Sequence, residues 1–326
     1  MMRPWRLLPA SWAHNLAPLA VKLAAEIAGD KESSDWHPLD WRGLHFPNRL
    51  GVAGGLDKNG ETMLAWQSLG AGFIEIGTVT PQPQLANPGK ILDRDWQSQN
   101  LWNRMGFPND GATEIAFNFR QVKDDLKIPV FVNLGKNRDT PNEHAVDDYL
   151  ASIPKFPFAS GFVINVSSPN TAGLRDLQSR STLAPLCRAI SHAAVPRPVL
   201  VKLSPDMSEV ELKESIAAAL EGGVAGFVLT NTTSDRPANC PFPKEGGLSG
   251  RDLRARSIQA LKWALAMQRG GSFLLVSVGG VLSYDDWKER LDLGADLVEV
   301  YTATVFHGPF FFRNIKQQWQ NSFSKE

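Results

Sequence analysis

Eight short runs of apolar and β-branched residues recur along the chain between residues 50 and 301. Each run is continuous rather than alternating, which is typical of parallel strands covered on both faces. The expected strands occupy residues 50–53, 73–76, 130–134, 162–166, 199–203, 226–230, 273–278 and 297–301. Helix-compatible segments lie between them, at residues 60–69, 110–125, 183–193, 208–221, 253–268 and 283–293. The pattern therefore predicts an α/β fold.

A closed barrel accommodates eight strand–helix units better than an open sheet does. A (β/α)8 barrel, or TIM barrel, has this number of units in roughly 250 residues. An open doubly wound sheet usually has fewer strands and a G-x-G-x-x-G fingerprint, which residues 53–58 (AGGLDK) do not match. Ser208 followed by Glu211 predicts a capping box, and Ser283 before two aspartates predicts a second helix start.

The first 45 residues contain no strand-like run and are expected to form a small helical extension, followed by the barrel at residues 46–326. As far as Lys22, this extension carries Arg3, Arg6 and Lys22 but no acidic residue. Pro18 predicts either a kink or two short helices. Apolar side chains recur at helical spacing: Trp12, Leu16, Leu19, Leu23 and Ile27. Such a stripe is typical of a helix that lies on a membrane surface, although it would also suit packing on the barrel.

The composition argues against several other classes of protein. Basic and acidic residues number 34 each, and zero net charge disfavours a nucleic-acid-binding protein. The two cysteines, Cys187 and Cys240, make no disulfide framework and indicate a reducing compartment. No apolar run reaches the roughly 18 residues that span a bilayer, and no secretory h-region is followed by a small-residue cleavage site, so neither a spanning helix nor a signal peptide is expected. No metal site is predicted, because neither H-x-x-x-H nor C-x-x-C occurs.

Polar side chains follow nearly all of the expected strands, at the end where a TIM barrel carries its active site. They are Asp57, Lys58, Thr78, Asn133, Asn165, Ser168, Asn170, Lys202, Thr230, Asn231 and Thr302. Amides and amines without histidines suit a planar, anionic molecule, with a cofactor carrying the chemistry. The Gly279-Gly280 turn and the glycine-rich segment 246–250 favour a phosphate site. Ser168 has no histidine near it in the sequence, so a hydrolytic triad is not expected.

Two lysines in this set have different expected surroundings. Lys202 ends an apolar strand, where an unpaired ammonium is costly to bury, so a carboxylate or a reduced flavin ring is expected beside it. Lys58 follows Asp57, and the simpler interpretation of these two residues is a local ion pair at the surface.

Seven segments resemble the dihydroorotate dehydrogenase family, in the order in which that family carries them. They are residues 54–60 (GGLDKNG), 75–81 (EIGTVTP), 103–107 (NRMGF), 165–171 (NVSSPNT), 230–233 (TNTT), 246–250 (GGLSG) and 278–280 (VGG). The resemblance extends from residue 14 to residue 309. It implies a barrel that binds FMN and oxidises dihydroorotate to orotate in the synthesis of pyrimidines.

The resemblance also implies individual site residues. Ser168 would be the base that removes the C5 proton while the C6 hydride moves to the flavin, and Lys202 would stabilise negative charge on the flavin. FMN would contact Ala53, Gly54, Thr78, Asn133, Asn165, Lys202, Thr230, Gly250, Gly280, Tyr301 and Thr302. The substrate would be held by Lys58, Asn103, Arg104, Met105, Gly106, Phe107, Asn165, Asn170, Asn231 and Thr232.

The residue at the base position also indicates the electron acceptor. Family members that reduce fumarate or NAD carry cysteine there, whereas Ser168 resembles the quinone-dependent members. This class implies a membrane quinone as partner and a peripheral location on the cytoplasmic side of the cell membrane. His14, Arg94 and Tyr301 match positions that line the quinone tunnel.

Arg94 lies in a departure from the family pattern. Asp93 and Asp95 flank it where relatives carry apolar residues, and ion pairs with these acids would weaken its quinone role. Two alternatives remain, a fumarate- or NAD-linked relative and an FMN-binding barrel without turnover. The presence of the two lysines and of Ser168 argues against the second alternative.

Overall fold

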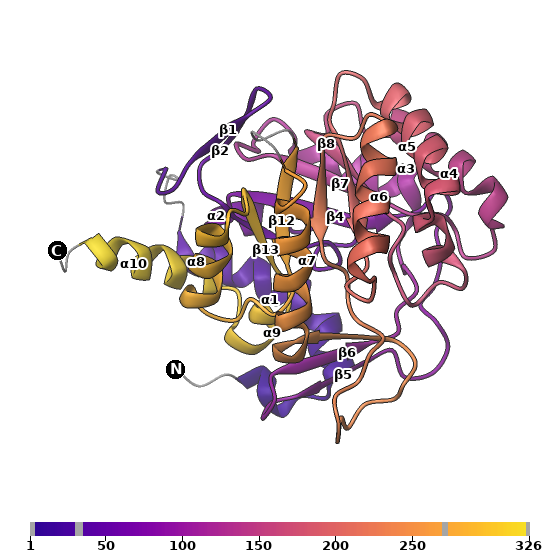
Figure 1. The fold of residues 1–326 in the computed structure, drawn as a ribbon. Helices are drawn as coiled ribbons and strands as arrows, with labels where there is room; N and C mark the ends of the chain where they lie inside the picture. The colour runs from indigo at the N-terminus through magenta and orange to yellow at the C-terminus, as the bar shows by residue number, and fades with distance from the viewer. Residues whose placement is uncertain (1–3, 30–34, 269–272, 324–326) are drawn as a thin grey trace.

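Eight parallel strands close into a barrel in the computed structural model, which describes residues 4–29, 35–268 and 273–323 (Figure 1). The strands are β3 (Leu50–Val52), β4 (Phe73–Val79), β7 (Val130–Leu134), β8 (Gly161–Asn165), β9 (Val199–Leu203), β10 (Gly226–Leu229), β12 (Leu274–Val278) and β13 (Leu297–Val300). They pair in the order β10-β12-β13-β3-β4-β7-β8-β9, which closes on itself. All eight expected runs are therefore strands, and the predicted TIM barrel is confirmed.

Helices cover the outside of the barrel (Figure 1). They are α2 (Met63–Ser68), α3 (Gly111–Val122), α4 (Ala145–Ser152), α5 (Arg180–Ala194), α6 (Glu209–Glu221), α7 (Arg254–Leu265), α8 (Tyr284–Leu293), α9 (Thr302–His307) and α10 (Phe311–Phe323). The predicted capping box is present, because Ser208 and Glu211 each accept a hydrogen bond from the other's backbone N–H. The main apolar core lies between the helices and the strands and includes the buried side chains of Phe156, Phe162 and Trp287.

A hairpin closes the end of the barrel where the strands begin. It consists of β1 (Leu39–Trp41) and β2 (Leu44–Phe46), so the expectation of no strand before residue 45 is wrong. Both turn residues, Arg42 and Gly43, have positive φ, as in the two-residue turns that suit hairpins. Three-residue strands are too short to show periodicity, which is why the sequence pattern did not indicate them. Phe46 packs with Phe73 and Phe131 inside the barrel.

A small antiparallel sheet lies at the opposite end. Its strands are β5 (Leu92–Asp95), β6 (Asn100–Asn103) and β11 (Gly247–Gly250), in the order β11-β6-β5. Figure 1 shows β5 and β6 at the bottom of the view, next to the N-terminal segment, and the hairpin at the top. This sheet was not expected, because β11 is separated from its partner β6 by more than 140 positions of the chain. It covers the ends of the barrel strands where the polar residues lie.

The N-terminal extension contains one helix, α1 (Ala10–Ala28), preceded by a 3-10 turn at Pro4–Leu7. Pro18 lies inside α1, so the alternative of two separate helices is wrong. Arg3, one of the three basic residues noted in the sequence, lies outside the described residues.

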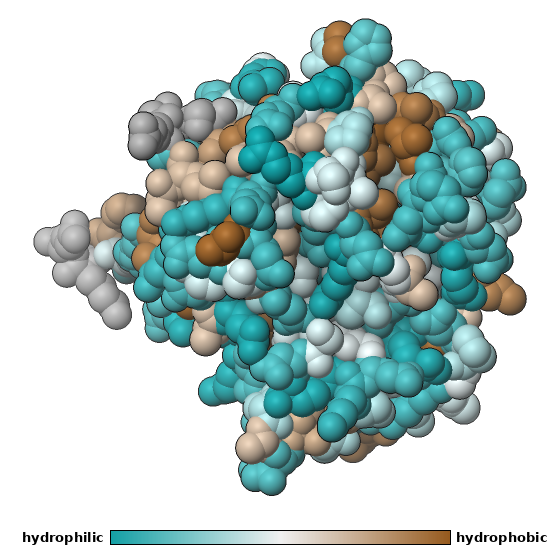
Figure 2. Space-filling model, turned by 45° about the vertical axis from the view of Figure 1, so that its right-hand side comes forward, coloured by the Kyte–Doolittle hydropathy of each residue, from teal (hydrophilic) through white to brown (hydrophobic). Residues whose placement is uncertain are grey.

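The apolar stripe of α1 faces outward. The five side chains are 47–80% exposed, so the alternative that they pack on the barrel is wrong: Trp12, Leu16, Leu19, Leu23 and Ile27. Val21 and Ala24, by contrast, are buried on the inner side of the helix. Within the described residues, no helix has both the length and the hydrophobicity needed to cross a membrane. On the face drawn in Figure 2, hydrophobic side chains lie in small groups among hydrophilic ones.

Candidate active site

A cavity opens at the carboxyl ends of the barrel strands and is bordered by the β5–β6–β11 sheet. It encloses about 1000 Å³ including its open mouth, which is the scale of a small-molecule site. Most of the residues expected to hold FMN or substrate line it: Ala53, Gly54, Lys58, Thr78, Asn103, Met105, Gly106, Phe107, Asn133, Asn165, Ser168, Asn170, Lys202, Thr230, Asn231, Thr232, Gly280, Tyr301 and Thr302. The fold therefore gathers at one place residues that are spread over 250 positions of the chain.

The expected site residues that are not among those lining the cavity are Arg104, Gly250, His14 and Arg94. The guanidinium of Arg104 donates to the carbonyl of Pro88 at 2.6 Å and lies 3.4 Å from the carboxylate of Glu245. Gly250 ends β11 with φ +101°, and a Cβ there would lie 2.2 Å from the carbonyl oxygen of Gln99. In this structure Arg104 thus links loops next to the small sheet, and Gly250 allows β11 to approach the backbone at Gln99 closely.

Charged side chains meet at the floor of the cavity. Nζ of Lys202 lies 2.8 Å from Oε1 of Glu75 on β4 and 3.8 Å from Oε2 of Glu299 on β13. Nδ2 of Asn133 donates to the same oxygen of Glu75 at 2.8 Å. All four side chains are buried. The anionic partner expected for Lys202 is therefore a carboxylate within the barrel itself.

The protonation states in this cluster follow from burial and mutual attraction. Burial raises the pKa of Glu299 well above its usual range, and the nearby carboxylate of Glu75 raises it further. Burial alone would lower the pKa of Lys202, but attraction to Glu75 and Glu299 outweighs it and the pKa is raised. Lys202 and Glu75 thus form an ion pair beside Glu299, and burial favours the protonated form of the Glu299 carboxyl. Sequence reasoning missed both glutamates, although an acid inside a continuous apolar strand was a usable signal.

Amide side chains connect the ends of four strands above this floor. Nδ2 of Asn165 donates to Oγ1 of Thr78 at 3.0 Å and to Oδ1 of Asn133 at 3.3 Å. Oδ1 of Asn165 accepts from Nδ2 of Asn231 at 3.2 Å, and Asn231 also donates to Oγ of Ser167 at 3.0 Å. These bonds fix the orientation of the amides, so their remaining donors and acceptors have defined directions.

Ser168 lies on the loop after β8 and is buried in the cavity wall. Its Oγ accepts a hydrogen bond from the backbone N–H of Asn170 at 3.2 Å. Nδ2 of Asn170 donates to Oδ1 of Asn103 at 2.8 Å, while Oδ1 of Asn170 is buried without a partner among the described residues. A free acceptor beside Ser168 leaves a bonding position for an N–H group of a ligand.

Lys58 does not form the expected surface ion pair with Asp57. Its Nζ lies 3.0 Å from Nε2 of His14 on α1, and burial lowers its pKa to about 8. Asp57 instead accepts hydrogen bonds from the backbone N–H groups of Glu61 and Thr62, at 2.8 and 2.9 Å. Asp57 therefore shapes the turn before α2, and Lys58 is left facing the cavity and α1.

The neighbouring acids do not hold Arg94, so that expectation is also wrong. Nη2 of Arg94 donates to the carbonyls of Trp5 and Leu8, at 2.7 and 2.6 Å. The carboxylates of Asp93 and Asp95 have other partners. The reason is that adjacent side chains on a strand point to opposite faces. Arg94 thereby ties β5 to the segment that precedes α1.

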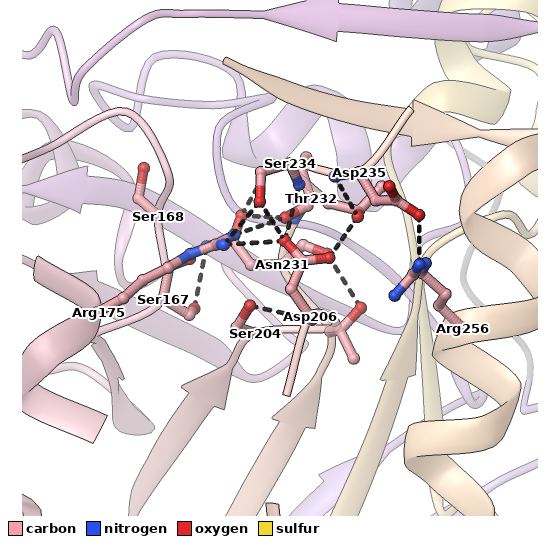
Figure 3. Close-up of polar contacts among 12 residues, drawn as sticks. Ser167, Ser168, Arg175, Ser204, Asp206, Asn231, Thr232, Ser234, Asp235 and Arg256 are labelled. Atoms are coloured by element: carbon pink, nitrogen blue, oxygen red, sulfur yellow. Dashed lines mark hydrogen bonds and ion pairs between the residues drawn. The ribbon is translucent and has the colours of Figure 1, made fainter. Parts of the chain in front are cut away.

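Behind the Ser168 loop, Arg175 joins three loops (Figure 3). Its guanidinium donates to the carbonyls of Ser167 and Thr232, at 3.0 and 3.1 Å, and lies 2.8 Å from Oδ2 of Asp206. Burial alone would raise the pKa of Asp206, but hydrogen bonds from its neighbours outweigh it and the pKa is lowered. Figure 3 shows the Ser168 side chain directed away from this cluster. Sequence reasoning missed Arg175, which lies ten positions beyond β8, and also Asp206, although its place three positions after β9 was a usable signal.

A TIM barrel whose strand ends surround a cavity with a serine, two lysines and oriented amides is an enzyme by class. In residues 4–29, 35–268 and 273–323, no group of three or more His, Cys, Asp or Glu is placed to hold a metal ion. Residues 39–323 match the family model described as dihydroorotate dehydrogenase. The chain belongs to the dihydroorotate dehydrogenase family, and the resemblance noted in the sequence is confirmed.

Several known proteins are similar to this chain over most of its length. Dihydroorotate dehydrogenase (quinone) of Thermus thermophilus is 45% identical over 277 residues, covering 84% of this chain and 79% of the relative. The protein of the same description from Dichelobacter nodosus is 39% identical over 311 residues, covering 91% and 90%. The crystal structure of the Eimeria tenella enzyme in complex with ferulenol superposes with a TM-score of 0.87 at 33% identity, covering 97% of this chain and 92% of that one.

Proposed function

We propose that this protein oxidises dihydroorotate to orotate with FMN as its cofactor and passes the electrons to a membrane quinone, in the synthesis of pyrimidines. The observation that carries the proposal is the position of Ser168, which lies with Lys58, Asn103, Asn170 and Asn231 around one cavity. A base, a cation and three amides suit a small anionic ring that carries N–H and C=O groups. Relatives described as quinone-dependent, at 39–45% identity, support the choice of acceptor.

The cavity fits FMN in two respects. Gly279 and Gly280 line it with φ of +113° and +72°, so a phosphate is able to approach their backbone closely. Amides and Lys202 lie at its floor, where they match the donors and acceptors of a flavin ring. When bound, FMN supplies the hydride acceptor of the reaction. Its ring and phosphate are assigned to Ala53, Gly54, Thr78, Asn133, Asn165, Lys202, Thr230, Gly280, Tyr301 and Thr302.

The substrate occupies the part of the cavity next to the small sheet. Lys58 pairs with its carboxylate, and a pKa near 8 leaves most of this lysine protonated at neutral pH. Asn103, Asn170 and Asn231 bond the ring N–H and C=O groups, with the free Oδ1 of Asn170 accepting from an N–H. Met105, Gly106 and Phe107 cover the ring, and Thr232 closes its edge.

Ser168 removes the proton from C5 of the substrate. The N–H of Asn170 donates to Oγ of Ser168 and so stabilises negative charge that develops on this oxygen. Among the described residues, no carboxylate or imidazole makes a hydrogen bond to Oγ of Ser168. The hydroxyl proton therefore passes to water as the proton from C5 arrives.

The electron acceptor reaches the cavity from the side of α1. An apolar cluster of Leu92, Leu101 and Met105, with Ala10 and Tyr301 packed against it, joins α1 to the cavity. A quinone with an apolar tail suits such a path, and His14, Arg94 and Tyr301 are the polar groups assigned to its head. The exposed apolar side chains of α1 support an entrance that faces a membrane surface, and the location that we propose is the cytoplasmic side of the cell membrane.

Two absorbance measurements test this function. The purified protein is expected to show the yellow spectrum of oxidised FMN and to lose it on anaerobic addition of dihydroorotate. A short-chain quinone is then expected to restore the spectrum faster than fumarate or NAD does. A colourless protein would overturn the cofactor assignment, and faster reoxidation by fumarate or NAD would overturn the quinone assignment.

A further inference from the structure

Arg290 is a buried cation that no step of the proposed reaction uses. It lies on α8, and its side chain is wholly buried. Its guanidinium donates to Oγ of Ser277 and Oγ of Ser257, each at 2.9 Å, and to the carbonyl oxygen of Gly279 at 2.8 Å. These three acceptors are neutral, and Nε has no partner among the described residues.

The acids nearest in sequence are engaged by another arginine. Arg254 on α7 forms ion pairs with Asp286 and Glu289, both on α8. Within the described part of the chain, Arg290 has no ion pair of its own. Burial lowers the pKa of Arg290 to about 10, so it remains protonated at neutral pH. A buried, unpaired cation is costly, and a bound anion nearby would offset that cost.

The carbonyl that Arg290 holds belongs to the glycine turn at the edge of the cavity. Ser257 also donates to this oxygen of Gly279, at 2.7 Å. The Gly279–Gly280 peptide is trans, so the N–H of Gly280 points away from the carbonyl and therefore away from Arg290. Both glycines line the cavity, and neither N–H donates to another described residue. Arg290 thus fixes the peptide whose free N–H faces the cavity.

Only glycine fits at this turn. Gly280 has φ +72°, and a Cβ on it would lie 2.5 Å from Cα of Arg254. The turn is therefore pressed against the start of α7 on one side and held by Arg290 from α8, which leaves its remaining side for a ligand.

We infer that Arg290 is a positioning residue of the phosphate site, which aims the N–H of Gly280 at the FMN phosphate and adds a positive charge behind it. This inference rests on the proposed function, because it assumes that the anion at this turn is the phosphate of FMN. The positive charge of Arg290 polarises the Gly279–Gly280 peptide, which makes the N–H of Gly280 a stronger donor to the phosphate. The low dielectric around this buried guanidinium strengthens the polarisation. This positioning role affects only the binding of the phosphate, whereas a purely structural role would affect the binding of the whole flavin.

Riboflavin, which is FMN without the phosphate, separates these two roles. The holoenzyme is purified, its flavin is removed and the protein is reloaded with FMN or riboflavin, with the dissociation constants read from flavin fluorescence. In Arg290→Met, the dissociation constant of FMN is expected to rise about tenfold or more, and that of riboflavin to change by less than about twofold. Arg290→Lys keeps the charge but not the fork of three donors, so a smaller, still FMN-selective loss is expected.

The matched control is Lys288→Met, which removes an exposed positive charge from the same helix. It is expected to leave both dissociation constants unchanged. If the Arg290 variants bind FMN and riboflavin more weakly by the same factor, the role of Arg290 is structural and the inference is overturned. Unchanged binding of FMN in these variants would also overturn it. Should Arg290→Met fail to fold, the same comparison in Arg290→Lys decides. A wild-type protein that binds neither flavin would instead overturn the proposed function.

Discussion

Nζ of Lys58 lies 3.0 Å from Nε2 of His14, which joins the loop after β3 to helix α1. A protonated lysine has only donors, so His14 accepts this hydrogen bond in its neutral form. Burial, followed by repulsion from Lys58, lowers the pKa of His14 to about 3, in agreement with that state. The N-terminal helix therefore touches the lysine that is assigned to the substrate carboxylate, in addition to presenting its apolar side chains outward.

The pKa of Lys58 predicts a pH limit on substrate capture. Because burial lowers this pKa to about 8, the free enzyme loses the lysine charge as the pH rises above that value. The kcat/KM for flavin reduction by dihydroorotate is thus expected to fall about tenfold per pH unit above pH 8. Lys58→Arg stays charged in this range, so its profile is expected to show no such fall, at a higher KM. A wild-type profile that stays level to pH 10 would contradict the assignment of Lys58.

Removal of the Ser168 hydroxyl is expected to separate flavin binding from flavin reduction. Ser168→Ala keeps the residues that surround the flavin and loses the base, so the FMN spectrum is expected to persist. Stopped-flow reduction by dihydroorotate is expected to slow by roughly 10²- to 10⁴-fold, the usual contribution of a general base. Ser168→Cys provides a control, because a thiolate restores a base and its rate should rise with pH. Unchanged reduction in the alanine variant would remove Ser168 from this role.

The apolar stripe of α1 is expected to bind the protein to a lipid surface. Replacing Leu19 and Ile27, which are 58% and 80% exposed, with glutamine removes apolar area without disturbing a buried contact. Co-sedimentation with vesicles that contain anionic lipid is expected to fall several-fold, while dihydroorotate still reduces the flavin at the original rate. Phe117→Gln on α3, another exposed apolar residue, serves as control and should sediment like the wild type. Equal sedimentation of all variants would exclude α1 as the membrane contact.

Arg175 is expected to matter for the rate although it does not line the cavity. It holds the loops that carry Ser168 and Asn231, and a displacement of about 1 Å costs up to roughly 10²-fold in rate. Arg175→Ala should therefore slow flavin reduction by about 10- to 100-fold, with FMN retained and partial recovery in Arg175→Lys. Arg180→Ala, which removes an exposed ion pair at the start of α5, is the control and should leave the rate unchanged. A wild-type rate in Arg175→Ala would show that the loops hold their position without it.

The two glutamates beside Lys202 are expected to contribute very differently to stability. Glu75→Gln leaves a buried lysine without its ion pair and should lower the free energy of unfolding by about 3–5 kcal/mol at pH 7. Burial raises the pKa of Glu299 and so favours its protonated form, which glutamine resembles, so Glu299→Gln should change that free energy by less than about 1 kcal/mol. Urea denaturation of both variants measures the difference, and equal losses would contradict the assigned protonation states.

The order of elements was predictable because it depends on local patterns. Continuous apolar runs indicated all eight barrel strands, and the capping box at Ser208 indicated the start of α6. Most polar residues of the cavity were also predictable, since they lie near the carboxyl end of a barrel strand or on the loop that follows it, and parallel strands in a barrel end on one face. Motifs such as residues 103–107 and 165–171 then led to the family.

Pairings between distant residues were not predictable from such patterns. Lys202 indicated that an anion was needed, but its partner Glu75 lies 127 positions away and only closure of the barrel brings them together. The local pattern alone favoured a surface ion pair for Lys58, because Asp57 precedes it. In the structure the backbone turn gives Asp57 other donors and α1 covers Lys58.

The sequence by itself therefore determined the barrel, its chemistry-bearing face and its family, because these depend on residue type and order along the chain. The tertiary structure alone decided which charges meet, that the α1 stripe faces outward and that Arg290 is buried without an ion pair of its own among the described residues. Burial and electrostatic pairing depend on through-space distance, and short-range sequence patterns do not encode that distance.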